Sequence, residues 1–324
     1  MEPIILPRIS DQKPLVSIVS ITYNHELYIR DCLEGFLMQK ARFPIEIIVH
    51  DDASTDHTAD ILREYYKKKP DLFHIILEKD NQFSQGKDVL IPLYEQAQGK
   101  YIAVCEGDDY WIDPLKLQKQ FDFMESHPEY SGCIHNFFVN YCQREITKKR
   151  NNYYKMHKII NLPNAIRNGT KDIHLCTAFF SKKAISDIWS IKNNCPVGDY
   201  PLQICLAKHG NIYYIDNTMS VYRKGSAGSW SSKNTILQIQ LDHANRMIDW
   251  LQSIRPIVKD NESVDIAIGA YLYFKAKKQK KRINTHGSKE IRKYLSEQSI
   301  TKKIYILFYN FWHYTRLLER LVTI

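Results

Sequence analysis

The chain has 324 residues, of which 44% are hydrophobic and 25% charged, and its formal net charge at pH 7 is +9. These proportions are ordinary for a globular protein, and no uncharged apolar run reaches the roughly 18–20 residues of a membrane-spanning helix. The first twelve residues lack the apolar core of a signal peptide. The seven cysteines form no CxxC pair, which argues against a zinc site or a disulfide framework, so we expect a reducing cytoplasm.

The positive charge is concentrated near the C-terminus. Residues 271–303 hold eleven lysines and arginines and two acids, whereas the rest of the chain holds 34 residues of each sign. We therefore expect an electrostatically neutral main domain and a basic C-terminal segment.

The first third of the chain predicts an alternation of strands and helices. Residues 15–22 are apolar on both alternations, as in a strand buried on both faces, and Asn24 is a candidate cap for the next helix. Strands are expected at 15–22, 45–50, 74–77 and 101–105, and helices after Asn24, at 55–68 and at 88–98. This βαβ series predicts an α/β fold with a Rossmann-like, doubly wound, mostly parallel sheet.

The remainder predicts a continuation of this domain followed by a helical extension. Asp113 and Pro114 form a helix start signal. Further strands are expected at 132–142, 173–180, 211–215 and 219–223, helices at 113–126, 182–190 and 197–209, and a polar loop at 144–167. Because the pattern turns helical from about residue 231, we divide the chain into a domain at 1–230 and a C-terminal extension at 231–324.

Three carboxylates follow the strand at 101–105 within four residues. They belong to Glu106, Asp108 and Asp109, and Gly107 is the only other residue among them. Acids this close together raise one another's pKa. Binding of a hard cation such as Mg²⁺ or Mn²⁺ explains the cluster, and a solvated turn that caps the next helix is the alternative.

Polar residues also follow the other parallel strands. Thr22, Tyr23 and Asn24 end the first strand, and Asp51 and Asp52 end the second. Ligands of open α/β sheets bind beyond the carboxyl ends of the strands, so this convergence favours a site for a metal and a nucleotide. The chain has no GxGxxG loop after the first strand and no GxxxxGK[ST] loop, which disfavours a dinucleotide cofactor and a P-loop NTPase.

Five stretches in order form a family pattern. They read VSIVSITYN at 16–24, EIIVHDDASTD at 46–56, EGDDYW at 106–111, KLQKQ at 116–120 and GDYPL at 198–202. Together they resemble the family-2 glycosyltransferases of the GT-A fold over about residues 14–225. The similarity is greatest to bacterial enzymes that build capsular, exopolysaccharide or lipopolysaccharide chains.

The resemblance implies a nucleotide-sugar donor, with uracil as the expected base. Asp51 or Asp52 is expected to accept the imide N–H of the uracil ring, with Thr22, Tyr23 and Asn24 at the base and ribose. The alternative role of the two acids is to cap the helix that starts near Ser54. Lys87, in the turn Gln85–Gly86–Lys87, is a further candidate for a nucleotide contact.

The resemblance also implies a metal and a catalytic base. Asp109 is expected to bind Mn²⁺ or Mg²⁺ at the diphosphate, with Asp108 facing the metal or the nucleotide sugar and Glu106 in a supporting role. Adjacent strand residues face opposite ways, so both aspartates reach one ion only if the chain turns, which Gly107 permits. Asp199 is the implied general base, which deprotonates the acceptor hydroxyl so that transfer inverts the anomeric carbon. Its alternative role is an N-cap.

Two features depart from the family pattern. Family members often have Asp where this chain has Glu106, and a histidine soon after the Tyr-Arg pair that is absent after Tyr222–Arg223. A third protein ligand to the metal from that loop is therefore in doubt. Arg223 or Lys224 is expected to contact the diphosphate instead, because a cation on a Gly/Ser-rich loop suits phosphate recognition; a solvated loop is the alternative.

The C-terminal extension combines a basic run at 275–282 with an uncharged aromatic stretch at 304–315. Trp and Tyr favour membrane interfaces, and a basic run attracts anionic lipid. We therefore expect peripheral attachment to the cytoplasmic face of a membrane, near a lipid-linked acceptor. A helix packed on the core or in a homodimer is the alternative. Nucleic acid is not an expected partner, because the chain has no DNA- or RNA-binding motif.

The expected function is inverting, metal-dependent transfer of a sugar from a nucleotide donor to a glycan or lipid-linked glycan hydroxyl. Two alternatives stay open. A sugar nucleotidyltransferase usually has an early Gly-rich basic loop, but residues 14–30 contain no glycine and one arginine. A non-catalytic nucleotide-sugar-binding protein is disfavoured by the intact Asp108, Asp109 and Asp199.

Overall fold

The computed structural model describes residues 2–142, 146–150, 159–171, 173–226, 236–279 and 288–298. They divide into two compact units, which we describe separately. The first unit comprises 1–162, 170–189 and 198–233. The second comprises 234–324 and two short segments, 163–169 and 190–197, which the sequence division left in the first domain.

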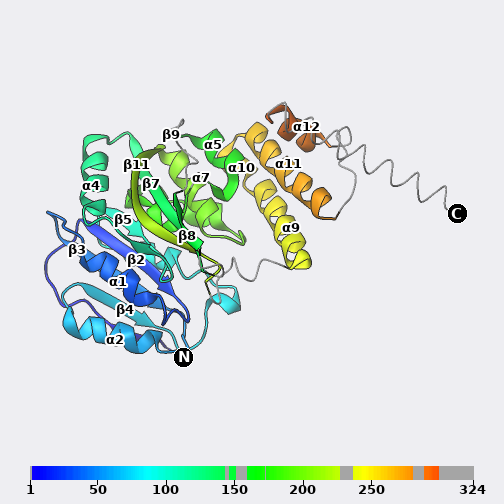
Figure 1. The fold of residues 1–324 in the computed structure, drawn as a ribbon. Helices are drawn as coiled ribbons and strands as arrows, with labels where there is room; N and C mark the ends of the chain where they lie inside the picture. Colours follow the sequence, from blue (N-terminus) through cyan, green and yellow to red (C-terminus); the bar gives the residue numbers. More distant parts are fainter. Residues whose placement is uncertain are drawn as a thin grey trace. The chain divides into compact units, whose positions relative to one another are not determined.

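Helices and strands alternate through the first unit (Figure 1). The strands are β1 (Ile4–Leu6), β2 (Val16–Thr22), β3 (Ile45–Asp51), β4 (Phe73–Leu77), β5 (Tyr101–Val104), β6 (Tyr110–Trp111), β7 (Tyr130–Tyr141), β8 (Ile146–Arg150), β9 (Ile159–Ile160), β10 (Phe179–Ser181) and β11 (Asn211–Lys224). The principal helices are α1 (Ile29–Leu37), α2 (Thr58–Lys68), α3 (Ile91–Gln96), α4 (Lys116–Ser126) and α7 (Asp199–His209). Shorter helical segments are η1 (Phe83–Gln85), η2 (Gly169–Lys171), η3 (Leu175–Thr177) and η4 (Lys182–Ile185). Two more, α5 (Leu162–Asn168) and α6 (Ile188–Lys192), lie mostly in the short segments assigned to the second unit.

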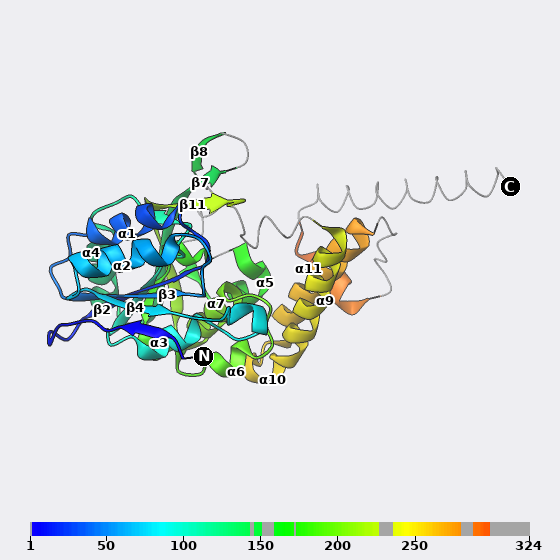
Figure 2. The same cartoon turned by 90° about the horizontal axis from the view of Figure 1, so that it is seen from below.

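The strands of the first unit form one sheet, with the order β1-β4-β3-β2-β5-β10-β7-β11-β6. Strands β4, β3, β2 and β5 are parallel to one another, as the βαβ pattern predicts. Strand β2 is buried on both faces along nearly its whole length. Figure 2 shows why: α1, α2 and α4 cover one face of the sheet, and α3 and α7 cover the other. The predicted α/β fold with a mostly parallel central sheet is confirmed.

The second half of the sheet differs from the sequence prediction in three places. The expected loop at 144–167 contains β8, which pairs with β7, as well as β9 and the start of α5. The expected strand at 173–180 begins as the helical turn η3, and only Phe179–Ser181 joins the sheet. The two strands expected at 211–223 form one strand, β11, which is interrupted by register shifts against β7. Short pairings with distant strands leave no local hydrophobic period, so a sequence pattern does not predict them.

Asn24 does not cap α1, contrary to expectation. The helix begins at Ile29, and the side-chain oxygen of Asn24 accepts a hydrogen bond from the backbone N–H of Thr55 at 2.7 Å. Asn24 has a left-handed backbone (φ 56°), which asparagine tolerates. Its backbone N–H also donates to the hydroxyl of Ser54 at 2.8 Å. Asn24 therefore joins the loops that follow β2 and β3.

The second unit is helical. It contains α9 (Leu237–Ser253), α10 (Arg255–Val258), α11 (Asn261–Lys278) and α12 (Lys289–Ser296), and α9 and α11 lie side by side in both ribbon views. Helix α12 packs closely on α11 at Gly269, where a Cβ atom would lie 2.1 Å from the carbonyl oxygen of Glu290. Asp265 is buried there and pairs with Arg255 and Lys293, each at 2.7 Å. The aromatic stretch at 304–315 lies outside the described residues.

Candidate active site

The carboxyl end of β5 leads into a turn at residues 106–109, which we call the acidic turn. The backbone N–H of Asp109 donates to the carbonyl of Glu106 at 3.0 Å, which closes the turn. Glu106, Asp108 and Asp109 each offer an oxygen, and these ligand atoms lie within 4.8 Å of one another. The chain thus turns as two adjacent aspartates require, and Glu106 offers an oxygen to the same cluster.

Gly107 is required by the packing of the acidic turn. A Cβ atom at this position would lie 2.8 Å from the hydroxyl of Thr22 and 2.9 Å from Nδ1 of His25. Real Cβ atoms do not approach so closely, so a larger residue would displace the turn from the end of β2. The backbone N–H of Gly107 also donates to the carbonyl of Ile21 at 2.9 Å.

The acidic turn concentrates negative charge in a dry environment. Burial, followed by the charges of Asp108 and Asp199, raises the pKa of Glu106 to about 8. Burial, followed by the charges of Asp108 and Glu106, raises the pKa of Asp109 well above its usual value. The neighbouring carboxylates therefore destabilise the ionised forms of Glu106 and Asp109. A divalent cation relieves this repulsion, and an all-oxygen donor set is the kind that Mg²⁺ and Mn²⁺ prefer, so these residues fit such an ion.

Asp199 lies close enough to the acidic turn to act on it electrostatically. It is the first residue of α7, where the helix dipole favours a carboxylate, and its Oδ1 accepts a hydrogen bond from the backbone N–H of Tyr200 at 2.8 Å. Its charge raises the pKa of Glu106, ninety-three positions earlier in the chain. The helix-start role and a role at the site are therefore compatible in one residue.

The first two parallel strands bring the predicted nucleotide residues together. Thr22 and Asp51 are register partners at the ends of β2 and β3, and the backbone N–H of Asp52 donates to the carbonyl of Thr22 at 2.9 Å. Tyr23, which follows Thr22 in the chain, is 37% exposed. Both aspartates are buried, with relative exposures of 1% and 4%.

The two buried acids shape their loops. Asp51 accepts hydrogen bonds from the hydroxyl and the backbone N–H of Ser54 at 2.5 and 3.1 Å. Asp52 accepts from the backbone N–H groups of Gln82 and Phe83 at 2.7 and 3.1 Å. Helix α2, however, starts at Thr58, whose N–H donates to Asp56 at 2.9 Å. Capping of this helix by Asp51 or Asp52 is therefore wrong.

Lys87 is linked to Asp52, directly after β3, through Gln82. Its Nζ donates to the side-chain oxygen of Gln82 at 2.6 Å, and the backbone of Gln82 donates to Asp52. Gly86, with φ at 80°, turns the chain between η1 and Lys87. Lys87 is exposed, so its ammonium group stays within reach of solvent at this rim.

Arg223 lies at the end of β11 against the acidic turn. Its Nη1 donates to the carbonyl of Asp108 at 2.9 Å, and its Nη2 pairs with Asp31 of α1. Its side chain is 9% exposed. Asp31 is 58% exposed, so this end of the guanidinium lies near the protein surface. The contact with a diphosphate that the sequence predicts for Arg223 stays a prediction.

Two residues that the sequence did not single out also lie at the site. His25 follows Asn24 directly; burial lowers its pKa, while the charge of Asp108 acts in the opposite direction. Tyr94 of α3 is buried, and its pKa is raised by burial and by the charges of Asp88, Glu106 and Asp199. The hydroxyl of Tyr94 makes no hydrogen bond within the described part of the chain. Adjacency to the motif could have indicated His25, but Tyr94 resembles any core residue of an amphipathic helix.

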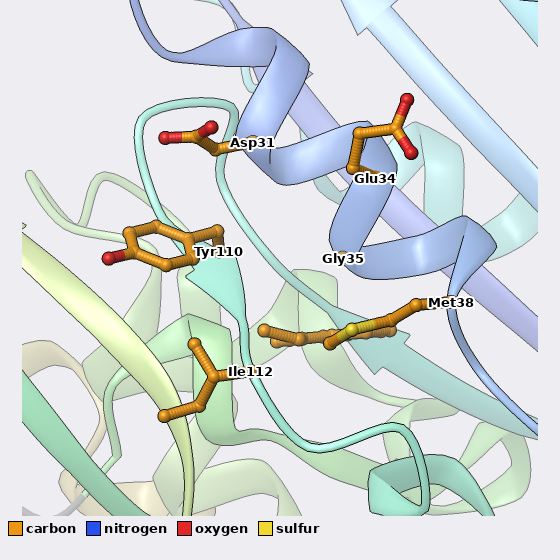
Figure 3. Close-up of a pocket in the computed structure, with 7 residues that line it drawn as sticks. Asp31, Glu34, Gly35, Met38, Tyr110 and Ile112 are labelled. Carbon is orange, nitrogen blue, oxygen red and sulfur yellow. The ribbon is translucent and has the colours of Figure 1, made fainter.

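A cavity of about 490 Å³ opens beside α1, and its lining residue Tyr110 directly follows Asp109 of the acidic turn. Figure 3 shows the residues around it: Asp31 and Glu34 of α1, Met38 directly after that helix, and Tyr110 and Ile112. None of the site residues predicted from the sequence lines this cavity. Arg223 also links this cavity to the acidic turn, because its ion-pair partner Asp31 forms part of the cavity wall.

Comparison with known proteins identifies the family. The model of glycosyl transferase family 2 matches residues 17–189, just over half of the chain. The chain belongs to this family. The match contains β3, the acidic turn and all of β2 except its first residue, whereas Asp199 and Arg223 lie beyond it.

Curated relatives of this glycosyl transferase family 2 protein come from several bacteria. The uncharacterized protein Rv1520 of Mycobacterium tuberculosis is 38% identical over 222 residues, 68% of this chain and 62% of that protein. The putative teichuronic acid biosynthesis glycosyltransferase TuaG of Bacillus subtilis is 38% identical over 35% of this chain and 42% of its own. The glucosyltransferase WfaP of Escherichia coli is 36% identical over the same shares. The chain thus spans about 62% of the length of its mycobacterial relatives.

Solved structures agree on the GT-A fold. TarS of S. aureus in complex with UDP-GlcNAc has a TM-score of 0.58 at 18% identity, covering 89% of this chain and 77% of TarS. The mannosyltransferase PcManGT of Pyrobaculum calidifontis in complex with GDP-Man and Mn²⁺ has a TM-score of 0.53 at 16% identity, covering 94% and 86%. Among the described residues, no helix combines the length and apolarity needed to cross a membrane.

Proposed function

We propose that this chain is an inverting, metal-dependent glycosyltransferase. It moves a sugar from a nucleotide donor, with UDP as the expected nucleotide, to a hydroxyl of a glycan or lipid-linked glycan in surface-polysaccharide synthesis. One observation carries the proposal: three converging carboxylates on the acidic turn, with Asp199 near enough for its charge to raise the pKa of Glu106. That arrangement supplies both a cation site and a separate base.

The residues divide the chemistry between them. Asp109, Asp108 and Glu106 hold Mn²⁺ or Mg²⁺, which neutralises the charge on the departing nucleoside diphosphate. Asp199 accepts the proton of the acceptor hydroxyl as its oxygen attacks the anomeric carbon. Attack from the face opposite the leaving group inverts the configuration at that carbon.

The donor half of the proposal places the nucleotide at the rim formed by β2 and β3. Thr22, Tyr23 and Asn24 contact the base and ribose, Asp51 or Asp52 accepts the uracil N–H, and Lys87 approaches the phosphates. Carboxylate oxygens accept more than one hydrogen bond, so the contacts of Asp51 and Asp52 within their loops leave them able to bind a base. The complexes of TarS with UDP-GlcNAc and of PcManGT with GDP-Man support a nucleotide-sugar donor.

The test is a panel of UDP-, GDP- and dTDP-sugars with Mn²⁺, followed by thermal shift and by release of the nucleoside diphosphate. We expect one UDP-sugar to stabilise the protein and to turn over only with the metal. Release of pyrophosphate instead would indicate a sugar nucleotidyltransferase. Binding without turnover for any acceptor would indicate a non-catalytic protein, and no binding of any donor contradicts the proposal.

We further propose peripheral attachment to an anionic membrane on the cytoplasmic side, through the second unit. Ile236, Leu237 and Ile239 at the start of α9 are 59%, 48% and 43% exposed. Helix α11 lies beside α9 and ends in lysines, and its Lys275 bonds to Asn245 of α9. Apolar and basic side chains together suit the surface of an anionic bilayer.

The attachment is tested by co-sedimentation of the full chain with vesicles. We expect binding to phosphatidylglycerol vesicles but not to phosphatidylcholine vesicles, and weaker binding after Ile236→Ser with Ile239→Ser. Ile9→Ser, at a 65% exposed site of the first unit, is the matched control. Unchanged binding of the double variant contradicts this surface, and a homodimer would appear as a doubled mass in light scattering.

A further inference from the structure

The end of β11 is bound to the acidic turn by three hydrogen bonds. The backbone N–H of Arg223 donates to Oδ1 of Asp109 at 2.8 Å. The guanidinium of Arg223 donates to the carbonyl of Asp108 at 2.9 Å, and the hydroxyl of Ser226 donates to Oδ2 of Asp108 at 2.6 Å. Both aspartates are therefore oriented from the same strand end.

The guanidinium of Arg223 is enclosed on its faces and at its edge. It lies 4.3 Å from the ring centre of Tyr110 and 5.2 Å from that of Tyr28, so aromatic rings stack on it. Its second terminal nitrogen pairs with Asp31. Arginine presents a rigid planar fork that binds acceptors in two fixed directions, whereas the compact ammonium group of lysine has no such fork.

From these contacts we propose that Arg223, together with Ser226, is a positioning residue for the metal-binding carboxylates. This inference rests on the proposed function, because it requires that the acidic turn hold a divalent cation. It replaces the sequence prediction of a diphosphate contact: the groups that would bind phosphate already bind the Asp108 carbonyl and the Asp31 carboxylate. Arg223 thus fixes where Asp108 and Asp109 point.

A purely electrostatic role and a positioning role of Arg223 predict opposite changes in Mn²⁺ affinity when the residue is replaced, so the proposal can be tested. A fixed positive charge beside a cation site weakens cation binding by repulsion alone. If charge were the whole role of Arg223, Arg223→Met would therefore raise the affinity for Mn²⁺. If positioning dominates, the same variant lowers it, by about tenfold to a hundredfold, the range seen when a group that orients metal ligands is lost.

The experiment is a Mn²⁺ titration of the full chain, followed by the electron paramagnetic resonance signal of the free ion. We expect Arg223→Met to lose affinity by that factor, Arg223→Lys to regain little of it, and Ser226→Ala to show a smaller loss of the same sign. Asp31→Asn, which removes only the distant partner of Arg223, should lie between wild type and Arg223→Met. Arg30→Met is the matched control, because Arg30 is exposed and its described contacts are with Glu64 and the ring of Tyr65.

A second measurement separates positioning from phosphate binding. UDP binding in EDTA should be the same for wild type and Arg223→Met, because the arginine does not contact the diphosphate. Thermal melts in EDTA show whether each variant is folded. If Arg223→Met does not fold, the Mn²⁺ affinity of Ser226→Ala is the test instead.

The outcomes distinguish this inference from the proposed function. Equal or tighter Mn²⁺ binding by folded Arg223→Met or Ser226→Ala overturns the positioning role, and a loss of UDP binding in EDTA restores the diphosphate contact. If the wild type itself binds no Mn²⁺, the metal-dependent function fails instead.

Discussion

The acidic turn and a second cluster, formed by Asp187, Cys205 and His209, each bring three ligand atoms within 4.8 Å of one another. We call the latter the Asp187 cluster. Its carboxylate pairs with Lys208 and, at 2.7 Å, with Nε2 of His209. The acidic turn has carboxylates at all three of its ligand positions. Proximity of ligand atoms alone therefore does not distinguish a cation site from a local ion-pair network.

The direction of the pKa shifts separates the two clusters. Hydrogen bonds from Lys208, His209 and Cys205 outweigh burial and lower the pKa of Asp187 to about 2. In the acidic turn, burial and like charges raise the pKa of Glu106 to about 8. The Asp187 cluster stabilises its own negative charge, whereas the ionised carboxylates of the acidic turn repel one another until a proton or a cation binds there.

The largest expected effect comes from removing a carboxylate of the acidic turn, with the matching removal in the Asp187 cluster as the control. Asp109→Asn should abolish Mn²⁺-dependent release of the nucleoside diphosphate, because the cation loses a buried ligand. Asp187→Asn should keep turnover within a few-fold of wild type. Both are measured by the same coupled assay at saturating Mn²⁺. Equal losses in the two variants would remove the functional distinction between the clusters.

Asp199→Asn should reduce turnover by roughly 10²–10⁴-fold, the usual contribution of a general base. Asparagine keeps the size of the side chain and its acceptor oxygen at the start of α7, so the fold should be retained. Mn²⁺ and nucleotide affinities, measured by titration, should stay near those of wild type. A variant that loses donor affinity but keeps its turnover rate would assign Asp199 to binding.

A third prediction concerns the metal-free protein. The folded-state pKa of Glu106, about 8, lies above its ordinary value of 4.5, so the folded chain binds this proton more tightly than the unfolded chain does. Its contribution to stability is present below pH 4.5 and is lost as the pH rises to about 8. In EDTA, Glu106→Gln should flatten the fall of the melting temperature over this range. If Glu106→Gln left the pH profile of the melting temperature unchanged, the raised pKa of Glu106 would be contradicted.

The smallest effect is expected at the Asp187 cluster, with the opposite sign. The pKa of Asp187 is lowered from 3.8 to about 2, so its contribution to stability is present above pH 3.8 and is lost as the pH falls toward 2. Asp187→Asn should remove that acid-side loss and leave the profile above pH 5 unchanged. Melts between pH 2.5 and 6 measure it, and a change at neutral pH would indicate a different role.

The parts of the fold predicted from sequence are those with local signals. Strand β2 could be predicted because its whole length is apolar, and the acidic turn because Gly107 separates three acids. Thr22 and Asp51 could be placed together because parallel strands end at one edge of a sheet. Each of these inferences needs only neighbouring residues and one rule of topology.

The parts that were missed depend on contacts between distant residues. Nothing in the local sequence of Arg223 shows that Asp31 and the carbonyl of Asp108 lie beside it. Tyr94 was missed because burial beside Glu106 and Asp199 depends on how α3 packs. Asn24 has the composition of a helix cap, but its hydrogen bonds cross to the next loop.

The most direct test is an anomalous diffraction map from crystals soaked with Mn²⁺ and a nucleoside diphosphate. The account predicts one strong peak enclosed by Glu106, Asp108 and Asp109, and none at the Asp187 cluster. A peak at Asp187, Cys205 and His209 with none at the acidic turn would contradict it.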